Sequence, residues 1–112
     1  EAHITEIAVR EHLRGRGVGE LLLIGSLRAA LEYGSKVMTL EVRVSNDVAQ
    51  SLYLKYAFEN KGIRPKYYTD NNEDAMIMTT PDIQSQEYRI LLASLIQAHS
   101  LRHGSSTRDL GE

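Results

Sequence analysis

Val-Arg-Glu-His-Leu-Arg-Gly-Arg-Gly-Val-Gly, at residues 9–19, is the most informative segment of this chain. It follows an apolar run at residues 4–9, typical of a strand, and precedes a leucine-rich run at 20–33, typical of a helix. Its glycines have no Cβ, so an anion can approach the backbone closely. The free N–H groups at a helix start and the helix dipole both favour such an anion. The segment therefore predicts a binding site for a phosphorylated cofactor.

The glycine spacing excludes two common nucleotide motifs. A dinucleotide fingerprint requires glycine or alanine three residues after Gly17, where this chain has Glu20. A Walker loop requires Gly-Lys-Ser/Thr, but Gly19 is followed by glutamate and leucine. Arg14 and Arg16 add charged hydrogen-bond donors to the loop.

The pattern Arg14-x-x-Gly17-x-Gly19 resembles the pyrophosphate loop of the GNAT superfamily of acetyl-CoA-dependent N-acetyltransferases. Four later segments follow in the order and spacing of that family, at residues 40–46, 51–58, 66–68 and 73–78. Within the superfamily they look most like the bacterial and plastid ribosomal-protein-alanine N-acetyltransferases. The resemblance covers residues 4–80 and implies an α/β fold: the C-terminal part of a GNAT-type mixed sheet, with a βαβ cofactor unit and antiparallel strands.

Periodicity and turn residues predict where the elements lie. Strands are expected at residues 4–9, 37–44, 58–63 and 75–80, and helices at 17–33, 47–57 and 83–101. Because a strand, a crossover helix and a second strand form a right-handed βαβ unit, the first two strands should be parallel. We divide the chain into an acetyl-CoA-binding domain at 1–81, an amphipathic helix at 82–101 and a disordered tail at 102–112.

Local signals refine the helices. Gly34 is a natural stop for the first helix, and Asn46 or Asp47 can cap the second, with Asp47 and Gln50 fitting a capping box. The expected apolar faces are Val48, Leu52 and Tyr56 on the second helix, and Tyr88, Leu91, Leu92, Leu95 and Ile96 on the third. The third helix should pack on the sheet or cover an exposed edge, or else bind a partner. The family commonly has glycine before Phe58; this chain has Ala57, which tolerates positive φ poorly, so the second helix should end differently.

Glu41 is the candidate general base. It is an acidic residue within an otherwise apolar strand, where glutamate is disfavoured, and a half-buried carboxylate suits proton transfer from an amine. The alternative is a structural ion pair with Arg43, which lies on the same strand face, or with another cation. The resemblance assigns Tyr53 as the proton donor to the departing thiolate. Tyr53 and Tyr56 are otherwise core aromatics, and the resemblance gives Tyr56 no role.

The resemblance also implies which residues hold acetyl-CoA. The first strand would bond the pantetheine arm through its backbone, the glycine loop would hold the pyrophosphate, and Asn46 would contact the arm as well as cap a helix. The implied cofactor-binding residues are Ile7, Ala8, Val9, Arg14, Gly15, Arg16, Gly17, Val18, Gly19, Glu20 and Asn46. The acidic loop at 70–74, with Tyr67 and Tyr68, would then receive a positively charged peptide amino terminus.

Composition limits the partners. The 112 residues suffice for one domain, and the net charge of −2 gives no general attraction to nucleic acid or membrane. No cysteine is present, which suits a reducing compartment, and the four histidines lack metal-ligand spacing, so no metal is expected. The resemblance implies a protein N-terminus, such as that of a ribosomal protein, as acceptor, and we expect a location in the cytoplasm or an organelle stroma.

The beginning of the chain leaves the function open to alternatives. It starts at Glu1 and enters a strand almost at once, whereas members of the family normally carry about half a domain before this point. The chain is expected to be a fragment, or a partner supplies the remainder. The alternatives are a truncated, non-catalytic CoA-binding or interaction module, and an acetyltransferase for a small amine.

Overall fold

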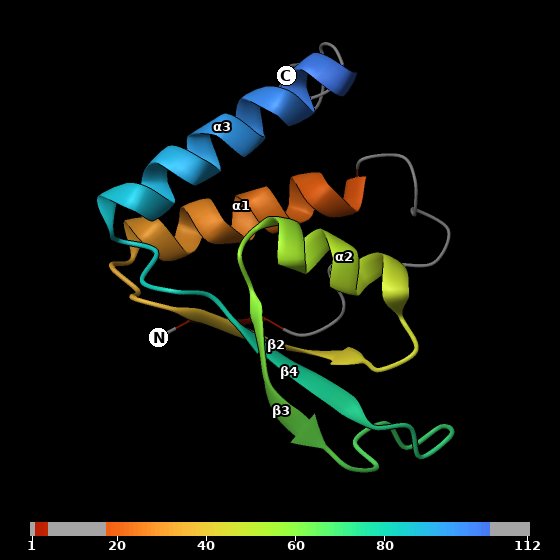
Figure 1. Ribbon diagram of the computed structural model, residues 1–112. Coiled ribbons are helices and arrows are strands. Elements are labelled where there is room, and N and C mark those ends of the chain that lie inside the picture. Colours follow the sequence, from red (N-terminus) through yellow and green to blue (C-terminus); the bar gives the residue numbers. More distant parts are fainter. Residues whose placement is uncertain (1, 5–17, 104–112) are drawn as a thin grey trace.

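The computed structural model describes residues 2–4 and 18–103, which form one mixed sheet with helices on one side (Figure 1). The strands are β1 (Ala2–Ile4), β2 (Met38–Arg43), β3 (Glu59–Arg64) and β4 (Ala75–Thr79), and the helices are α1 (Val18–Glu32), α2 (Asp47–Lys55) and α3 (Gln86–His103). The sheet order is β1-β2-β4-β3. β1 is parallel to β2, and β4 is antiparallel to both β2 and β3. The predicted α/β fold, with its βαβ unit and antiparallel strands, is confirmed.

The side chains of β2 alternate between two faces of the sheet. On one face, Leu40 and Val42 are buried in the core beneath the helices, with Met78 of β4 opposite Leu40. Glu41 and Arg43 point to the other face. The helical layer therefore covers the apolar face of β2 and leaves the candidate base on the opposite face.

α1 ends as the sequence predicts. Gly34 has φ +76°, its N–H donates to the Leu31 carbonyl at 3.1 Å, and the N–H of Ser35 donates to the Ala30 carbonyl at 3.0 Å. These two bonds form a Schellman motif, which needs a left-handed residue that glycine supplies without strain. The amide of Gln84, just before α3, adds a bond of 2.8 Å to the Ser35 carbonyl. The end of α1 is thereby attached to the start of α3.

The apolar face predicted for α2 is only partly correct. Val48 is 57% exposed, whereas Ala49 and Tyr53 are buried. Asn46, rather than Asp47, is the N-cap, and its Oδ1 accepts the N–H of Ala49 at 3.1 Å. The buried face of α2 is therefore formed by Ala49, Tyr53 and Tyr56, and Val48 lies outside it.

α3 packs on the other helices and not along a sheet edge, and its predicted bounds need correction. It begins at Gln86, because Ser85 caps it by accepting the N–H of Tyr88 at 3.1 Å. It continues to His103, so Arg102, which we expected in a disordered tail, is helical. The Tyr88 hydroxyl donates to the Tyr56 carbonyl at 2.9 Å, which joins α3 to the end of α2.

The inner face of α3 also differs from the expected one. Leu92 is buried with Tyr88, Leu95 and Ile96 are partly buried, and Leu91 is 36% exposed. His99 is 2% exposed and belongs to the buried face, although the apolar pattern of this helix did not include it.

Ala57 follows α2 with φ +69°, so alanine adopts here the conformation that glycine usually supplies, contrary to our expectation of a different helix end. We expect Ala57→Gly to raise the free energy of unfolding by up to about 1 kcal/mol, because relief of left-handed strain exceeds the added backbone entropy. Ala29→Gly, at an exposed helical position, should instead lower it by about 1 kcal/mol. Urea denaturation would measure both, and a destabilised Ala57→Gly variant would contradict the strain.

Candidate functional site

The glycine loop lies mostly outside the described residues. The predicted cofactor contacts that lie outside the described residues are Ile7, Ala8, Val9, Arg14, Gly15, Arg16 and Gly17. The remaining predicted loop contacts, Val18, Gly19 and Glu20, form the first turn of α1. The backbone N–H groups of a helix's first turn lack partners within the helix. The N-terminal end of α1 therefore has backbone N–H groups without partners inside the helix.

The Glu20 carboxylate is buried among three donors from other parts of the fold. Oε2 accepts the Tyr56 hydroxyl at 2.5 Å and lies 2.9 Å from Lys55 Nζ. Oε1 lies 3.1 Å from a guanidinium nitrogen of Arg102. We call Glu20, Lys55, Tyr56 and Arg102 the Glu20 cluster. It joins the beginning of α1 to the ends of α2 and α3.

Charge and burial shift two pKa values within the Glu20 cluster. Burial alone would raise the pKa of Glu20, but the hydrogen bonds from Tyr56 and Lys55 and the charges of Lys55 and Arg102 outweigh it, so the pKa lies below the ordinary 4.5. Burial and the bond to this carboxylate strongly raise the pKa of Tyr56. At neutral pH, therefore, Glu20 is an anion and Tyr56 is a neutral donor.

The lowered pKa of Glu20 makes the stability of the fold depend on pH in the acid range. A folded-state pKa below the unfolded value of 4.5 gives stability that is present above that value and lost as pH falls through the folded pKa. We expect Tm to fall as pH drops below about 4.5 and through the lower pKa of the folded state. Glu20→Gln should have a lower Tm at neutral pH but a shallower acid decline. Calorimetric curves that run parallel for the two proteins would contradict this.

Glu41 is 6% exposed at the centre of β2. Its Oε2 lies 3.4 Å from Nε of Arg64, on β3. The ion pair that we considered with Arg43 is wrong, and the alternative of another cation is correct. Arg64 is itself more than half exposed, so water screens this pair and its contribution to stability is small.

Arg43 instead holds the loop between β3 and β4. Its guanidinium makes two bonds to Asp70, at 3.0 and 3.1 Å, one of 3.2 Å to Glu73, and lies 4.0 Å above the ring of Tyr68. Hydrogen bonds from Ser45, together with those from Arg43 and Asn71, keep the pKa of Glu73 low. Two of the carboxylates that we expected to attract a peptide amino terminus thus share one guanidinium, which offsets one of their two negative charges. The alternation of side chains along a strand predicts that Arg43 faces away from the core, but it does not predict which residues Arg43 binds. This role was therefore not found from the sequence.

Tyr53 is buried in the helical core. It is 1% exposed, and its ring packs on Phe58 with centroids 5.6 Å apart. Because Leu40 and Val42 belong to the same core cluster, Tyr53 and Glu41 lie on opposite sides of β2. The core-aromatic interpretation of Tyr53 fits this packing, and its role as proton donor stays a prediction.

Asn46 fulfils the capping role that we predicted. Gln50, expected to complete a capping box with Asp47, instead donates its amide to the carbonyls of Arg43 and Val44, each at 3.0 Å. These bonds fix the turn between β2 and α2. The contact of Asn46 with a pantetheine arm stays a prediction.

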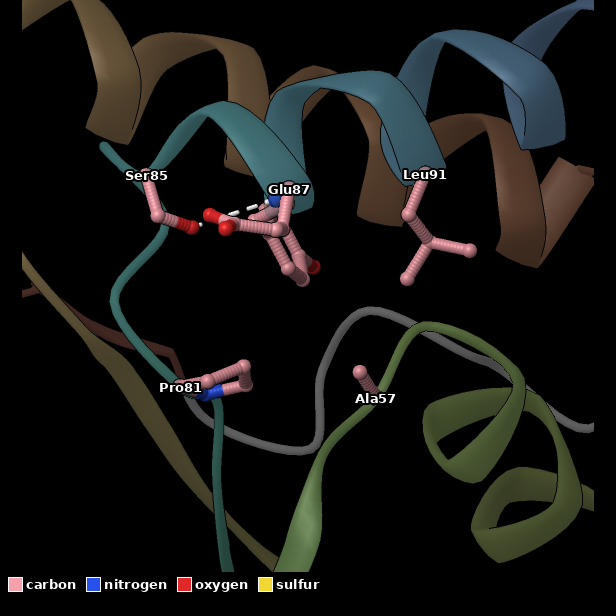
Figure 2. A pocket seen from close by; sticks show the side chains of 6 residues that line it. Ala57, Pro81, Ser85, Glu87 and Leu91 are labelled. Carbon is pink, nitrogen blue, oxygen red and sulfur yellow. Dashed lines mark hydrogen bonds between the residues drawn. The ribbon is translucent and has the colours of Figure 1, made fainter.

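An open pocket of about 190 Å³ lies between the turn after α2 and the start of α3 (Figure 2). Its lining residues are Ala57, Pro81, Ser85, Glu87, Tyr88 and Leu91. None of the candidate catalytic or cofactor residues lines it, so it is separate from the candidate site. Within residues 2–4 and 18–103, no group of three metal-ligating side chains is suited to an ion. No helix of this described part has the length and apolar character needed to cross a bilayer.

The parallel βαβ unit, with a glycine loop before its helix and an acidic residue in its second strand, has the fold of an acetyltransferase. The chain belongs to the acetyltransferase (GNAT) family, which matches residues 1–58. It is 46% identical over 78 residues to a protein of Bacillus subtilis named as a [ribosomal protein bS18]-alanine N-acetyltransferase, covering 70% of this chain and 52% of that one.

Solved structures agree with this assignment. The ribosomal-protein-S18-alanine N-acetyltransferase of Escherichia coli is 37% identical, with a TM-score of 0.60 over 71% of this chain and 54% of that one. A GNAT acetyltransferase of Elizabethkingia anophelis with acetyl-CoA bound is 26% identical, with a TM-score of 0.61 over 70% of this chain and 59% of that one. The chain spans about half the length of the curated relatives that it matches.

Proposed function

We propose that this chain is the cofactor-binding part of an acetyl-CoA-dependent N-acetyltransferase that acts on the α-amino group at a protein N-terminus. The βαβ unit made by β1, α1 and β2 carries this proposal, because it starts α1 directly after the glycine loop. The similarity to ribosomal-protein-alanine acetyltransferases favours a ribosomal protein as acceptor. The corresponding compartment is the cytoplasm or an organelle stroma.

In the proposed reaction, the neutral amine attacks the thioester carbonyl, the new C–N bond forms, and the C–S bond breaks. Glu41 takes the proton lost by the amine, directly or through water, and Tyr53 gives a proton to the departing thiolate. An α-amino group has a pKa of about 7.7–8.0, so a base of modest strength suffices. Because Glu41 and Tyr53 approach from opposite sides of β2, one side chain would serve the amine and the other the sulfur.

Acetyl-CoA would be held by backbone as much as by side chains. The N–H groups of the glycine loop and of the first turn of α1 would bind its diphosphate. The backbone at Ile7, Ala8 and Val9 would pair with the pantetheine arm in the manner of an added strand. Asn46, already fixed as the cap of α2, lies at the end of β2 and would contact the same arm.

The loop between β3 and β4 would contribute to the acceptor site through Tyr67 and Tyr68. Their rings contact edge to face, 5.0 Å apart, and Arg43 lies over Tyr68. Because Arg43 offsets one of the two negative charges of Asp70 and Glu73, the contact to a peptide would combine aromatic surface and backbone with the remaining negative charge.

Ligand binding tests this proposal, because a tight ligand raises Tm by mass action. Acetyl-CoA should raise the Tm of the full-length protein, whereas ATP and NAD should not. Gly17→Val should abolish the shift, because a side chain would occupy the place of the diphosphate. A matched control is Gly25→Ala in α1, where an added Cβ meets nothing within 4 Å. It should keep the full shift and add about 1 kcal/mol of stability.

The outcomes separate the alternatives. A shift with ATP or NAD, or a normal acetyl-CoA shift in Gly17→Val, would contradict the loop assignment. Acetyl-CoA binding without transfer to a peptide amine would favour the CoA-binding module, and transfer only to small amines would favour the small-amine enzyme.

A further inference from the structure

The described part of the chain has one buried carboxylate whose charge the proposed chemistry does not use, that of Glu20. It occupies the first turn of α1, the turn proposed above to bind the diphosphate. A negative side chain there stabilises the helix, but it also repels a second anion at the same helix end. The protein must therefore neutralise Glu20 for an anionic ligand to bind well.

The Glu20 cluster supplies this neutralisation from two directions. Lys55, the last residue of α2, lies 2.9 Å from one carboxylate oxygen, and Arg102, near the end of α3, lies 3.1 Å from the other. The Tyr56 hydroxyl donates to the same oxygen as Lys55 but carries no charge. Two cations thus face one carboxylate, so the Glu20 cluster carries a net charge of +1, and Arg102 is the contribution of α3 to that charge.

The position of Arg102 fits this role better than a merely structural one. α3 is already attached elsewhere, through Gln84 to the end of α1 and through Tyr88 to the end of α2. Arg102 lies at its far end, with its side chain 46% exposed, whereas the Glu20 side chain is 9% exposed. A half-exposed arginine contributes little to stability, but it contributes a full charge beside a shielded carboxylate.

We propose that Arg102 is a positioning residue for the cofactor: with Lys55 it leaves the Glu20 cluster with a net positive charge, which lets the first turn of α1 accept the diphosphate of CoA. This inference rests on the proposed function. α3 lies outside the region that the family model matches. Through Arg102 it would take part in cofactor binding without touching the ligand. The expected effect is electrostatic and acts on the charged end of the ligand only.

Calorimetric affinities of the full-length protein for CoA and for pantetheine, which has no phosphate, test the proposal. Arg102→Gln should weaken CoA binding by about 3–10-fold at low salt, with a smaller loss in high salt. Pantetheine binding should not change. Arg102→Lys should restore CoA affinity, and Glu20→Gln/Arg102→Gln should return to within about twofold of the wild type, because the repelling charge is gone.

Arg89→Gln is the matched control. It removes the same charge from the other end of α3, where the Arg89 guanidinium donates to Gln84, and it should leave CoA affinity unchanged. Unaltered CoA affinity in Arg102→Gln, equal losses for CoA and pantetheine, or no recovery in the double variant would overturn the proposal. If the wild-type protein itself fails to bind CoA, the proposed function fails first, and that result is distinct because it appears before any variant is made.

Discussion

Glu41→Gln is expected to lower kcat for acetyl transfer to a peptide amine by at least about 100-fold, the usual contribution of a general base. Glutamine keeps the shape of the side chain but cannot accept the proton of the attacking amine. The loss should be largest at low pH, where most of the amine is protonated and the need for a base is greatest. The affinity for acetyl-CoA should change little, because Glu41 faces away from the helical layer that carries the cofactor loop.

The ion pair with Arg64 provides the control for this prediction. If Glu41 serves only as a structural partner at 3.4 Å, Glu41→Gln and Arg64→Gln should each cost at most about 1 kcal/mol of stability and affect kcat alike. If Glu41 is the base, kcat should fall far more in Glu41→Gln than in Arg64→Gln. Steady-state kinetics across the pH range, with Tm measured for each variant, would decide. An unaltered pH profile in Glu41→Gln would remove this residue from the mechanism.

Features that depend on neighbours in the chain were predictable from the sequence. The glycine stop at Gly34 and the cap at Asn46 are set within a few residues, and both are confirmed. The βαβ unit follows from chain connectivity and handedness, so parallel pairing of β1 and β2 could also be predicted. The inner face of α2 was harder to predict, because packing against the sheet, and not the local sequence, decides that Ala49 is buried and Val48 is exposed.

Features that depend on distant contacts were not predictable. Arg102 and Glu20 are separated by most of the chain, and nothing near Arg102 indicates that it continues α3. Likewise, alternation along β2 places Glu41 and Arg43 on one face but does not reveal that they bind different partners, Arg64 and the loop residue Asp70. Only the sheet order, with β3 beyond β4, brings Arg64 near Glu41.

Tyr53→Phe separates two interpretations of a buried tyrosine, because it removes the hydroxyl and leaves the ring. If Tyr53 is only a core aromatic packed on Phe58, the ring contacts survive and kcat is unchanged. If it donates the proton to the thiolate, kcat should fall by about 100-fold or more. The deficit should shrink with thioesters whose thiols are more acidic, because such leaving groups need less protonation.

The matched variant is Tyr88→Phe, which removes another buried hydroxyl that has a structural partner. Burial raises the pKa of Tyr88 to about 12, so the group is neutral and donates to the Tyr56 carbonyl at 2.9 Å. Its loss should cost about 1–3 kcal/mol of stability and leave kcat unchanged at temperatures where the variant stays folded. The readout that separates the two variants is therefore kcat, which should fall in Tyr53→Phe and stay unchanged in Tyr88→Phe. Full turnover in Tyr53→Phe would leave the departing thiolate to take its proton from water, and Tyr53 would then be a packing residue alone.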